Sequence, residues 1–402
     1  MIRSILYAVV ASSFCAQAGL AQVRELPTPA AAGSLGPNLF AAADGRVYLS
    51  WIERMTDGRS GLRYAVYAGE GWSSPQVVAE GPDWFVNWAD FPSLIALPDG
   101  LLAAHWLVRN PSDPHAYDIR IALSADGGES WSKPLMPHRD GTATEHGFVS
   151  LFAAEDGRLA AAWLDGRNTQ ADSGAHGHGG GEMTLRYAAI GRDLRLHDEA
   201  QLDARVCDCC QTSAAVTADG PLVVFRDRSR LEERDIAVVR RREGRWQDPR
   251  AMPADLWRIE GCPVNGPAVA AHGRRVAVAW FTAANDVPRV RVAFSADAGA
   301  GFGRPVTVDD GRPLGRVDTV LLDDGDAVVS WLESSPEGSS LRLRRISPDG
   351  KTGKAVVVLP AGSRISNGFP QLARSGDTLL LAWTAERVRT AVLPIPAATA
   401  SP

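Results

Sequence analysis

The residues most able to do unusual chemistry are cysteines. Three of the five in the chain, Cys207, Cys209 and Cys210, fall within the four-residue stretch CDCC, and Cys262 follows in the segment GCPVNGPA. Three interpretations fit this pattern. A disulfide could join Cys262 to one of the other three, the thiolates could bind a soft metal, or an exposed pair could perform thiol redox chemistry.

A glycine-rich segment, AHGHGGGEM, adds His176 and His178 to the candidate metal ligands. Thiolates together with imidazoles suit copper or zinc. The spacing C-x-C-C is not a standard zinc pattern, and glycine-rich loops are commonly plain solvent-exposed insertions. The disulfide interpretation therefore stays open. The candidate metal set is Cys207, Cys209, Cys210, Cys262, His176 and His178.

A second group of side chains could act on a sugar or a small anion. Carboxylates and imidazoles can transfer protons, arginines can bind a carboxylate or sulfate through two hydrogen bonds, and an indole can stack on a sugar face. The acid–base candidates are Asp90, Glu145, His146 and Asp318. The candidates for substrate binding are Arg167, Arg226, Arg228, Arg316, Asn265, Asn367 and Trp88. Arginines paired with nearby aspartates and a packed tryptophan are the alternatives.

The elements that position these residues come from an internal repeat. A phrase close to G-x-P-x-L-x-A-x-x-D-G-x-L-x-x-x-W recurs along the chain, and each copy predicts two apolar strands joined by a turn, for which Asp-Gly is the preferred dipeptide. The copies begin at Gly36, Asp90, His146, Cys210, Asn265, Gly315 and Asn367. A further strand pair follows most copies, so the repeating unit is a four-stranded antiparallel sheet.

Seven such units in series predict an all-β propeller of seven blades, with six as the alternative. The last unit has three strands, and the segment VRELP near Val23 could supply the fourth and close the ring. We therefore expect one propeller domain over residues 22–397. Loops that precede the first strand of each unit share one face, called the top. The cysteines and the acid–base candidates should converge there, near the axis.

The N-terminal segment has the features of a secretory signal peptide. Arg3 precedes a short apolar run, and small residues offer a cleavage site near residue 21. We expect a periplasmic or secreted protein without a membrane span, and a monomer. A net charge of −5 and a pI near 5.9 argue against nucleic acid as a partner.

One turn carries a family resemblance. SADGGESW resembles a complete Asp box, S-x-D-x-G-x-[ST]-W, and SADAGAGF resembles a second copy. Asp boxes are typical of sialidases and related propellers. The order CDCCQTS, then GCPVNGPA, also resembles exported bacterial proteins named exo-α-sialidase-like. The resemblance implies a sialidase-like propeller and, if the protein is an enzyme, a glycoside hydrolase of exo-sialidase type.

The sialidase catalytic set is incomplete in this sequence. The family places an arginine in an R-I-P motif at the start of the first unit, where this chain has Gly36 before Pro37. The family's nucleophilic tyrosine lies late in the chain, whereas the last tyrosine here is Tyr187. Two hypotheses follow. The protein binds or hydrolyses a glycan at the top face, or its cysteines bind a soft metal or do thiol chemistry. We expect a glycan site, unlike a metal site, to survive thiol alkylation.

Overall fold

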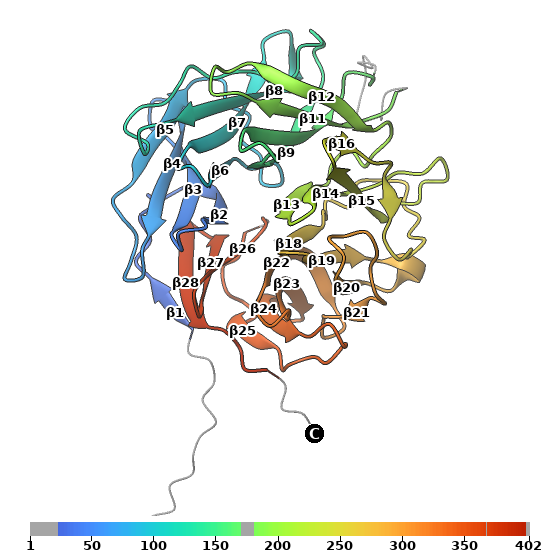
Figure 1. The fold of residues 1–402 in the computed structure, drawn as a ribbon. Coiled ribbons are helices and arrows are strands. Elements are labelled where there is room, and N and C mark those ends of the chain that lie inside the picture. Colours follow the sequence, from blue (N-terminus) through green and yellow to red (C-terminus); the bar gives the residue numbers. More distant parts are fainter. Residues whose placement is uncertain (1–22, 170–180, 367, 399–402) are drawn as a thin grey trace, which may run out of the picture.

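The computed structural model describes residues 23–169, 181–366 and 368–398. These residues form seven antiparallel sheets arranged as blades around a central axis (Figure 1). In blades one and three to six the strands follow chain order from one edge of the sheet to the other. The predicted seven-bladed propeller is therefore confirmed, and the six-bladed alternative is wrong.

The first three blades contain the following strands. Blade one has β2 (Leu35–Ala41), β3 (Val47–Arg54), β4 (Ser60–Tyr67) and β5 (Gln76–Gly81). Blade two has β6 (Ser93–Ala96), β7 (Leu102–Asn110) and β8 (Asp113–Ser124). Blade three has β9 (His146–Ala153), β10 (Leu159–Asp165), β11 (Thr184–Ile190) and β12 (Leu196–Asp203). In blade two a single bridge between Ile121 and Leu135 stands where the other blades have a fourth strand.

The remaining strands complete the ring. Blade four has β13 (Ser213–Thr217), β14 (Gly220–Arg226), β15 (Ile236–Arg242), β16 (Arg245–Trp246) and β17 (Arg250–Ala251). Blade five has β18 (Ala268–His272), β19 (Arg275–Thr282), β20 (Arg289–Ser295) and β21 (Val306–Thr307), with the short 3-10 helix η1 (Ala284–Asp286). Blade six has β22 (Pro313–Leu321), β23 (Ala327–Ser335), β24 (Gly338–Ile346) and β25 (Val356–Leu359). Blade seven has β26 (Gln371–Ser375), β27 (Thr378–Thr384) and β28 (Val388–Pro394).

The N-terminal strand β1 (Arg24–Leu26) completes blade seven. It pairs antiparallel with β28, with Glu25 opposite Ala391. Leu26 is only 2% exposed and packs in the core between blades seven and one. The two ends of the described chain therefore meet in one sheet, and the ring is closed by hydrogen bonds between them (Figure 1).

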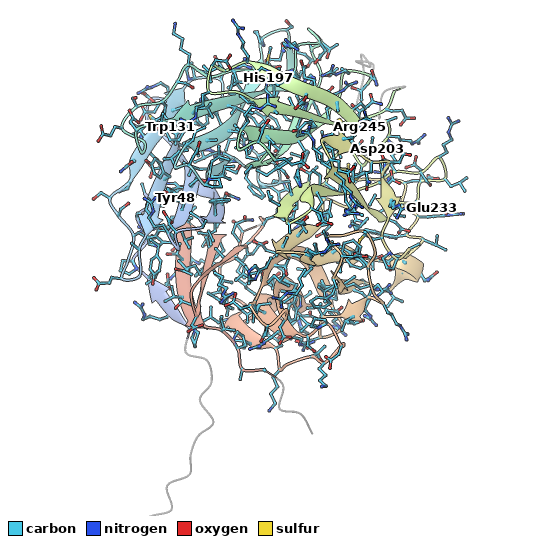
Figure 2. The ribbon with its side chains drawn as sticks, in the orientation of Figure 1. Tyr48, Trp131, His197, Asp203, Glu233 and Arg245 are labelled. Carbon is cyan, nitrogen blue, oxygen red and sulfur yellow. The ribbon has the colours of Figure 1, made fainter. Side chains whose placement is uncertain are left out.

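Apolar side chains fill the spaces between neighbouring sheets (Figure 2). The tryptophans on the second strand of six blades are the largest of these, with exposures of 5% or less, and they are Trp51, Trp106, Trp163, Trp280, Trp331 and Trp383. Trp131 of the Asp box meets Tyr64 of blade one edge-on, with ring centroids 6.2 Å apart. Within the box Asp126 accepts hydrogen bonds from the hydroxyl groups of Ser124 and Ser130. The Asp box thus fixes the turn and joins two blades.

A membrane-spanning helix is not found in the described parts of the chain, because no helix there has the necessary length and apolar character.

Candidate functional site

A cavity of about 440 Å³ opens among the loops that precede the first strands of blades two, three, four and five. We call it the top cavity. Its lining residues are Phe85, Asn87, Trp88, Ala89, Asp90, Tyr117, Glu145, Phe148, Asp208, Cys209, Cys262 and Val264. Two acid–base candidates, two cysteines and one binding candidate from the sequence therefore face the same space. Tyr117, Phe85 and Asp208 were not predicted.

Asp90 is the most strongly perturbed acid of the top cavity. It is 3% exposed, and both carboxylate oxygens lie 2.9 Å from the backbone nitrogen of Phe148. Burial raises the pKa of Asp90 to about 7, against hydrogen bonds from the Phe148 N–H and the Tyr117 hydroxyl, and the charge of Glu145 raises it further. Asp90 can therefore gain and lose a proton near neutral pH.

Tyr117, within β8, lies beside Asp90 and makes a side-chain hydrogen bond with it. Its ring stacks on Phe85, with centroids 3.9 Å apart and 4° between the planes. Burial raises the pKa of the Tyr117 phenol well above 10, and the charges of Asp90 and Glu145 act in the same direction. Tyr117 therefore stays protonated and donates to Asp90. Tyr117 thus lies near two carboxyl groups, those of Asp90 and Glu145, but a phenol that keeps its proton is a poor nucleophile.

Glycine at position 147 permits this arrangement. A Cβ atom added to Gly147 would overlap the Asp90 carboxylate and lie 2.7 Å from Tyr117 Cε2. Asp90 and Tyr117 both lie close to the backbone of β9 at position 147. Only glycine, which has no side chain, leaves room for them there. The sequence HGF at residues 146–148 thus belongs to the construction of the site as well as to the repeat.

The Asp90–Phe148 contact is one copy of a clasp between consecutive blades. In each copy a side-chain oxygen accepts the backbone N–H of the next blade, and the acceptors are Asp90, Gln211, Asn265 and Asp318. The donors, in the same order, are Phe148, Gly266, Arg316 and Leu372. Amides serve in two copies, so the clasp requires an acceptor but no acid. The clasp alone therefore does not explain why Asp90 and Asp318, the acceptors in the other two copies, are carboxylic acids.

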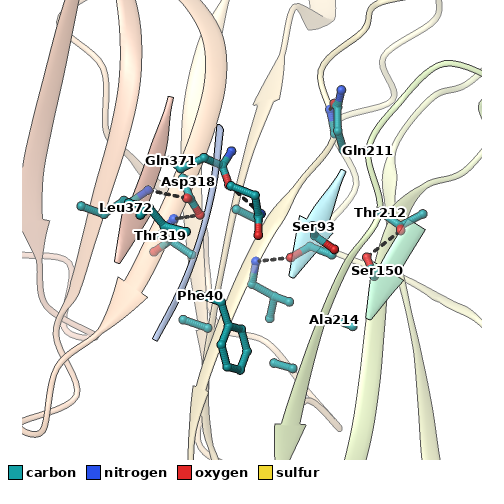
Figure 3. A pocket seen from close by; sticks show the side chains of 18 of the residues that line it. Phe40, Ser93, Ser150, Gln211, Thr212, Ala214, Asp318, Thr319, Gln371 and Leu372 are labelled. Atoms are coloured by element: carbon teal, nitrogen blue, oxygen red, sulfur yellow. Dashed lines mark hydrogen bonds between the residues drawn. The ribbon is translucent and has the colours of Figure 1, made fainter. Parts of the chain in front are cut away.

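Asp318 lies outside the top cavity, although it shares a second cavity with Asp90. It lines the axial cavity, a space of about 560 Å³ enclosed by the innermost strands (Figure 3). Its two oxygens accept the N–H groups of Thr319 and Leu372, at 2.8 and 2.7 Å. Burial raises the pKa of Asp318 to about 7, as it does for Asp90. Asp318 is thus a chemically matched acid that does not line the top cavity.

The cysteines converge as predicted. Cys207 Sγ lies 3.8 Å from Cys209 Sγ and 3.3 Å from Cys210 Sγ. The three sulfurs lie within 4.8 Å of one another, and Cys209 forms a second such group with Asp208 and Cys262. Cys207 and Cys210 are buried, Cys209 is half-buried and Cys262 is exposed. Cys209 therefore connects the buried thiols to the top cavity.

Two buried arginines surround these thiols. Arg234, 1% exposed, donates to Cys207 Sγ at 3.2 Å and to Glu232 at 2.8 Å. Arg226, 2% exposed, donates to the backbone oxygens of Asn265, Phe281 and Arg234. Arg226 is therefore a buried cation held by backbone oxygens, and its role in substrate binding stays a prediction. Arg228 pairs with Glu232, with both Nε–O distances 3.1 Å.

His146 belongs to a buried ionic network outside the top cavity. Its ring is 0% exposed and stacks on His138, with centroids 3.7 Å apart. Its Nε2 lies 3.3 Å from Asp140 and 3.7 Å from Asp165. Arg167 makes two hydrogen bonds to Asp165, at 2.6 and 2.7 Å. His146 and Arg167 therefore contact this network and do not line the top cavity, and their roles in catalysis and substrate binding stay predictions.

Arg316 and Trp88 remain beside the top cavity. The Arg316 guanidinium lies 4.6 Å from the centre of the Trp88 ring and donates to the backbone oxygen of Val264. Trp88 is 37% exposed, so part of its ring is available to a ligand. Asn265 serves in a clasp. His176, His178 and Asn367 lie outside the described residues, as does the expected signal peptide.

Comparison with known proteins places the fold. No family model and no curated protein matches the chain. An ulvan lyase of a new polysaccharide lyase family, bound to -[GlcA(1-4)Rha3S]-, shares 12% identity over 92% of this chain and 96% of its own, with a TM-score of 0.56. A protein of unknown function from Dyadobacter fermentans shares 14% identity over 93% of this chain and 97% of its own, with a TM-score of 0.51. A mutant of NanB sialidase from Streptococcus pneumoniae shares 11% identity over 90% of this chain and 68% of its own, with a TM-score of 0.46.

The likeness to the ulvan lyase and to the Dyadobacter protein agrees with the seven-bladed β-propeller fold seen in the sheet order. At such low identity these likenesses describe the fold alone. Their printed activities, on ulvan and on sialic acid substrates, belong to those proteins.

Proposed function

We propose that the protein binds a glycan in the top cavity and that Asp90 transfers a proton there, with Glu145 as the partner carboxylate. The observation that carries the proposal is the position of Asp90. Asp90 lines a cavity of about 440 Å³, its pKa is about 7, and it accepts a hydrogen bond from Tyr117. Cavities of this size and mixed lining are typical of small-ligand sites.

The chemistry follows from the protonation state of each group. Below pH 7 Asp90 carries a proton that it can donate to a glycosidic oxygen, as a general acid does. Tyr117 stays neutral and orients the Asp90 carboxyl group through its hydroxyl. Glu145, whose charge acts on both groups, would be the second carboxylate. Two carboxyl groups in distinct roles are the usual requirement for glycoside cleavage.

The walls of the top cavity favour a sugar that carries negative charge. The exposed part of Trp88 offers aromatic surface for stacking, and the Arg316 guanidinium lies over the Trp88 ring. A uronate or sulfate group placed near Trp88 would meet this cation. One arginine beside the cavity and a protonated tyrosine depart from the three-arginine clamp and tyrosine nucleophile of the sialidase family. We therefore propose an anionic glycan substrate other than a sialoside.

The test combines a ligand panel with matched variants. Uronate-containing, sulfated and sialylated oligosaccharides are screened by calorimetry for binding and by mass spectrometry for cleavage. Asp90→Asn should lose cleavage of the best substrate by at least about 100-fold, the size typical of a lost general acid. Asp318→Asn, an equally buried acid outside the top cavity, should cleave normally. Equal behaviour of the two variants, or no binding across the panel, would refute the proposal.

A further inference from the structure

We propose that Cys207, Cys209 and Cys210 bind one Cu(I) ion, at a site that is separate from the glycan-binding function. Thiolates are the ligands that monovalent copper prefers. The three residues stand in the loop before β13, where the chain turns from blade three into blade four. The proposal rests on the distances between the sulfurs and on the buried charges around them.

The sulfur positions fit a single ion. An ion about 2.3 Å from each of three sulfurs, in their plane, holds them about 4.0 Å apart. The observed Cys207–Cys209 and Cys207–Cys210 separations are 3.8 and 3.3 Å, and all three sulfurs lie within 4.8 Å. Small rotations of the side chains therefore suffice to place an ion among them.

The surrounding charges call for an anionic cluster. All three guanidinium nitrogens of Arg226 donate to backbone carbonyl oxygens, which carry no net charge. Arg234 donates directly to Cys207 Sγ. Since a buried cation is costly unless an anion balances it, the thiols are best placed to serve as that anion. Disulfide bonds would be neutral and would leave Arg226 uncompensated, whereas three thiolates with one Cu(I) keep negative charge beside both arginines.

Copper is favoured over zinc by the number of sulfurs. Structural zinc sites take four protein ligands in a tetrahedron. The fourth thiol, on Cys262, belongs to a second group that shares Cys209 but contains neither Cys207 nor Cys210, and its Sγ contacts Asp208 at 3.6 Å. Three sulfurs alone complete a trigonal Cu(I) site. Because Cys209 lines the top cavity, an ion at this site could be loaded from that side.

The experiment titrates the full-length protein, reduced and without oxygen, with Cu(I) in the presence of a coloured Cu(I) chelator. The wild type should withdraw one equivalent from the chelator and show thiolate-to-copper absorption. Cys209→Ser should weaken the affinity by more than the roughly 10- to 100-fold that loss of an outer-shell partner costs. Cys262→Ser, the matched control, should bind copper as the wild type does.

A second readout does not depend on folding of a variant. Copper-loaded wild type should resist alkylation at Cys207, Cys209 and Cys210 while Cys262 reacts. Alkylation of Cys207, Cys209 and Cys210 as well as Cys262 in the loaded protein would overturn the proposal. So would copper that stays on the chelator, equal affinities of the two variants, or protein isolated from its native compartment with its thiols in disulfides and no metal. None of these outcomes bears on glycan binding by Asp90.

Discussion

Replacement of Asp90 by asparagine should change how stability depends on pH. The Asp90 carboxyl group has a pKa of about 7 in the folded protein and an ordinary value of 3.8 in the unfolded chain. A raised folded pKa means that the folded state holds its proton more tightly. The stability that Asp90 contributes is therefore complete below pH 4 and is lost as the pH rises through 7.

The magnitude follows from the difference between the two pKa values. A shift of about 3 units corresponds to about 4 kcal/mol of unfolding free energy, lost by the wild type between pH 4 and pH 8. Asparagine keeps an acceptor oxygen for the Phe148 N–H but does not titrate. Its altered hydrogen bonds should cost about 1 kcal/mol at pH 4. At pH 8 Asp90→Asn should then be more stable than the wild type by about 3 kcal/mol.

The assay is urea denaturation followed by tryptophan fluorescence, at intervals from pH 4 to pH 8. Because the two proteins share every other titrating group, the difference between their curves isolates Asp90. The curves should cross between pH 4 and pH 6. Parallel curves would show that the pKa of Asp90 is not raised, and the proposed acid role would lose its physical basis.

Two further substitutions test how the site and the ring are built. Gly147→Ala should lower the unfolding free energy by about 1–3 kcal/mol, the range for an overpacked site, because the new methyl group meets Asp90 and Tyr117. Gly71→Ala, where an added Cβ meets nothing within 4 Å, should be near neutral in the same denaturation assay, and equal losses would contradict this account. Leu26→Ala should cost about 2–5 kcal/mol, because β1 buries this side chain where the ring closes. A change below about 0.5 kcal/mol in thermal unfolding would show that closure does not depend on β1.

The fold can be predicted from the sequence because the seven copies of the repeat correspond to the seven blades. Each copy of the repeat supplies the first two strands of one blade, and a segment near Val23 was available for the last strand. The meeting of Cys209 and Cys262 also follows from the repeat, since both precede the first strand of their blades. Position within a unit is enough to predict such neighbours.

The direction of a side chain cannot be predicted in the same way. His146 and Asp90 occupy similar places in the repeat, yet His146 turns into a buried network while Asp90 faces the top cavity. Tyr117 gave no signal apart from its place near the start of a strand. Arg226 resembled a ligand-binding residue because nothing in the sequence reveals that three backbone oxygens surround it.

The structure also changes one expectation about thiol alkylation. From the sequence, a glycan site should be indifferent to modified cysteines. In the structure Cys209 and Cys262 line the same cavity as Asp90. A group attached to the exposed Cys262 would therefore occupy the space proposed for the sugar.

The most direct test of the top cavity as the functional site uses this exposed thiol. A bulky maleimide is attached to Cys262 in copper-loaded protein, and binding of the best oligosaccharide from the panel is measured by calorimetry. The same label on a Ser347→Cys variant, in an exposed turn after β24, is the control, with Cys262 replaced by serine. The account predicts that the Cys262 label abolishes binding and the control label does not. Unchanged binding with Cys262 labelled would place the glycan elsewhere and contradict the account.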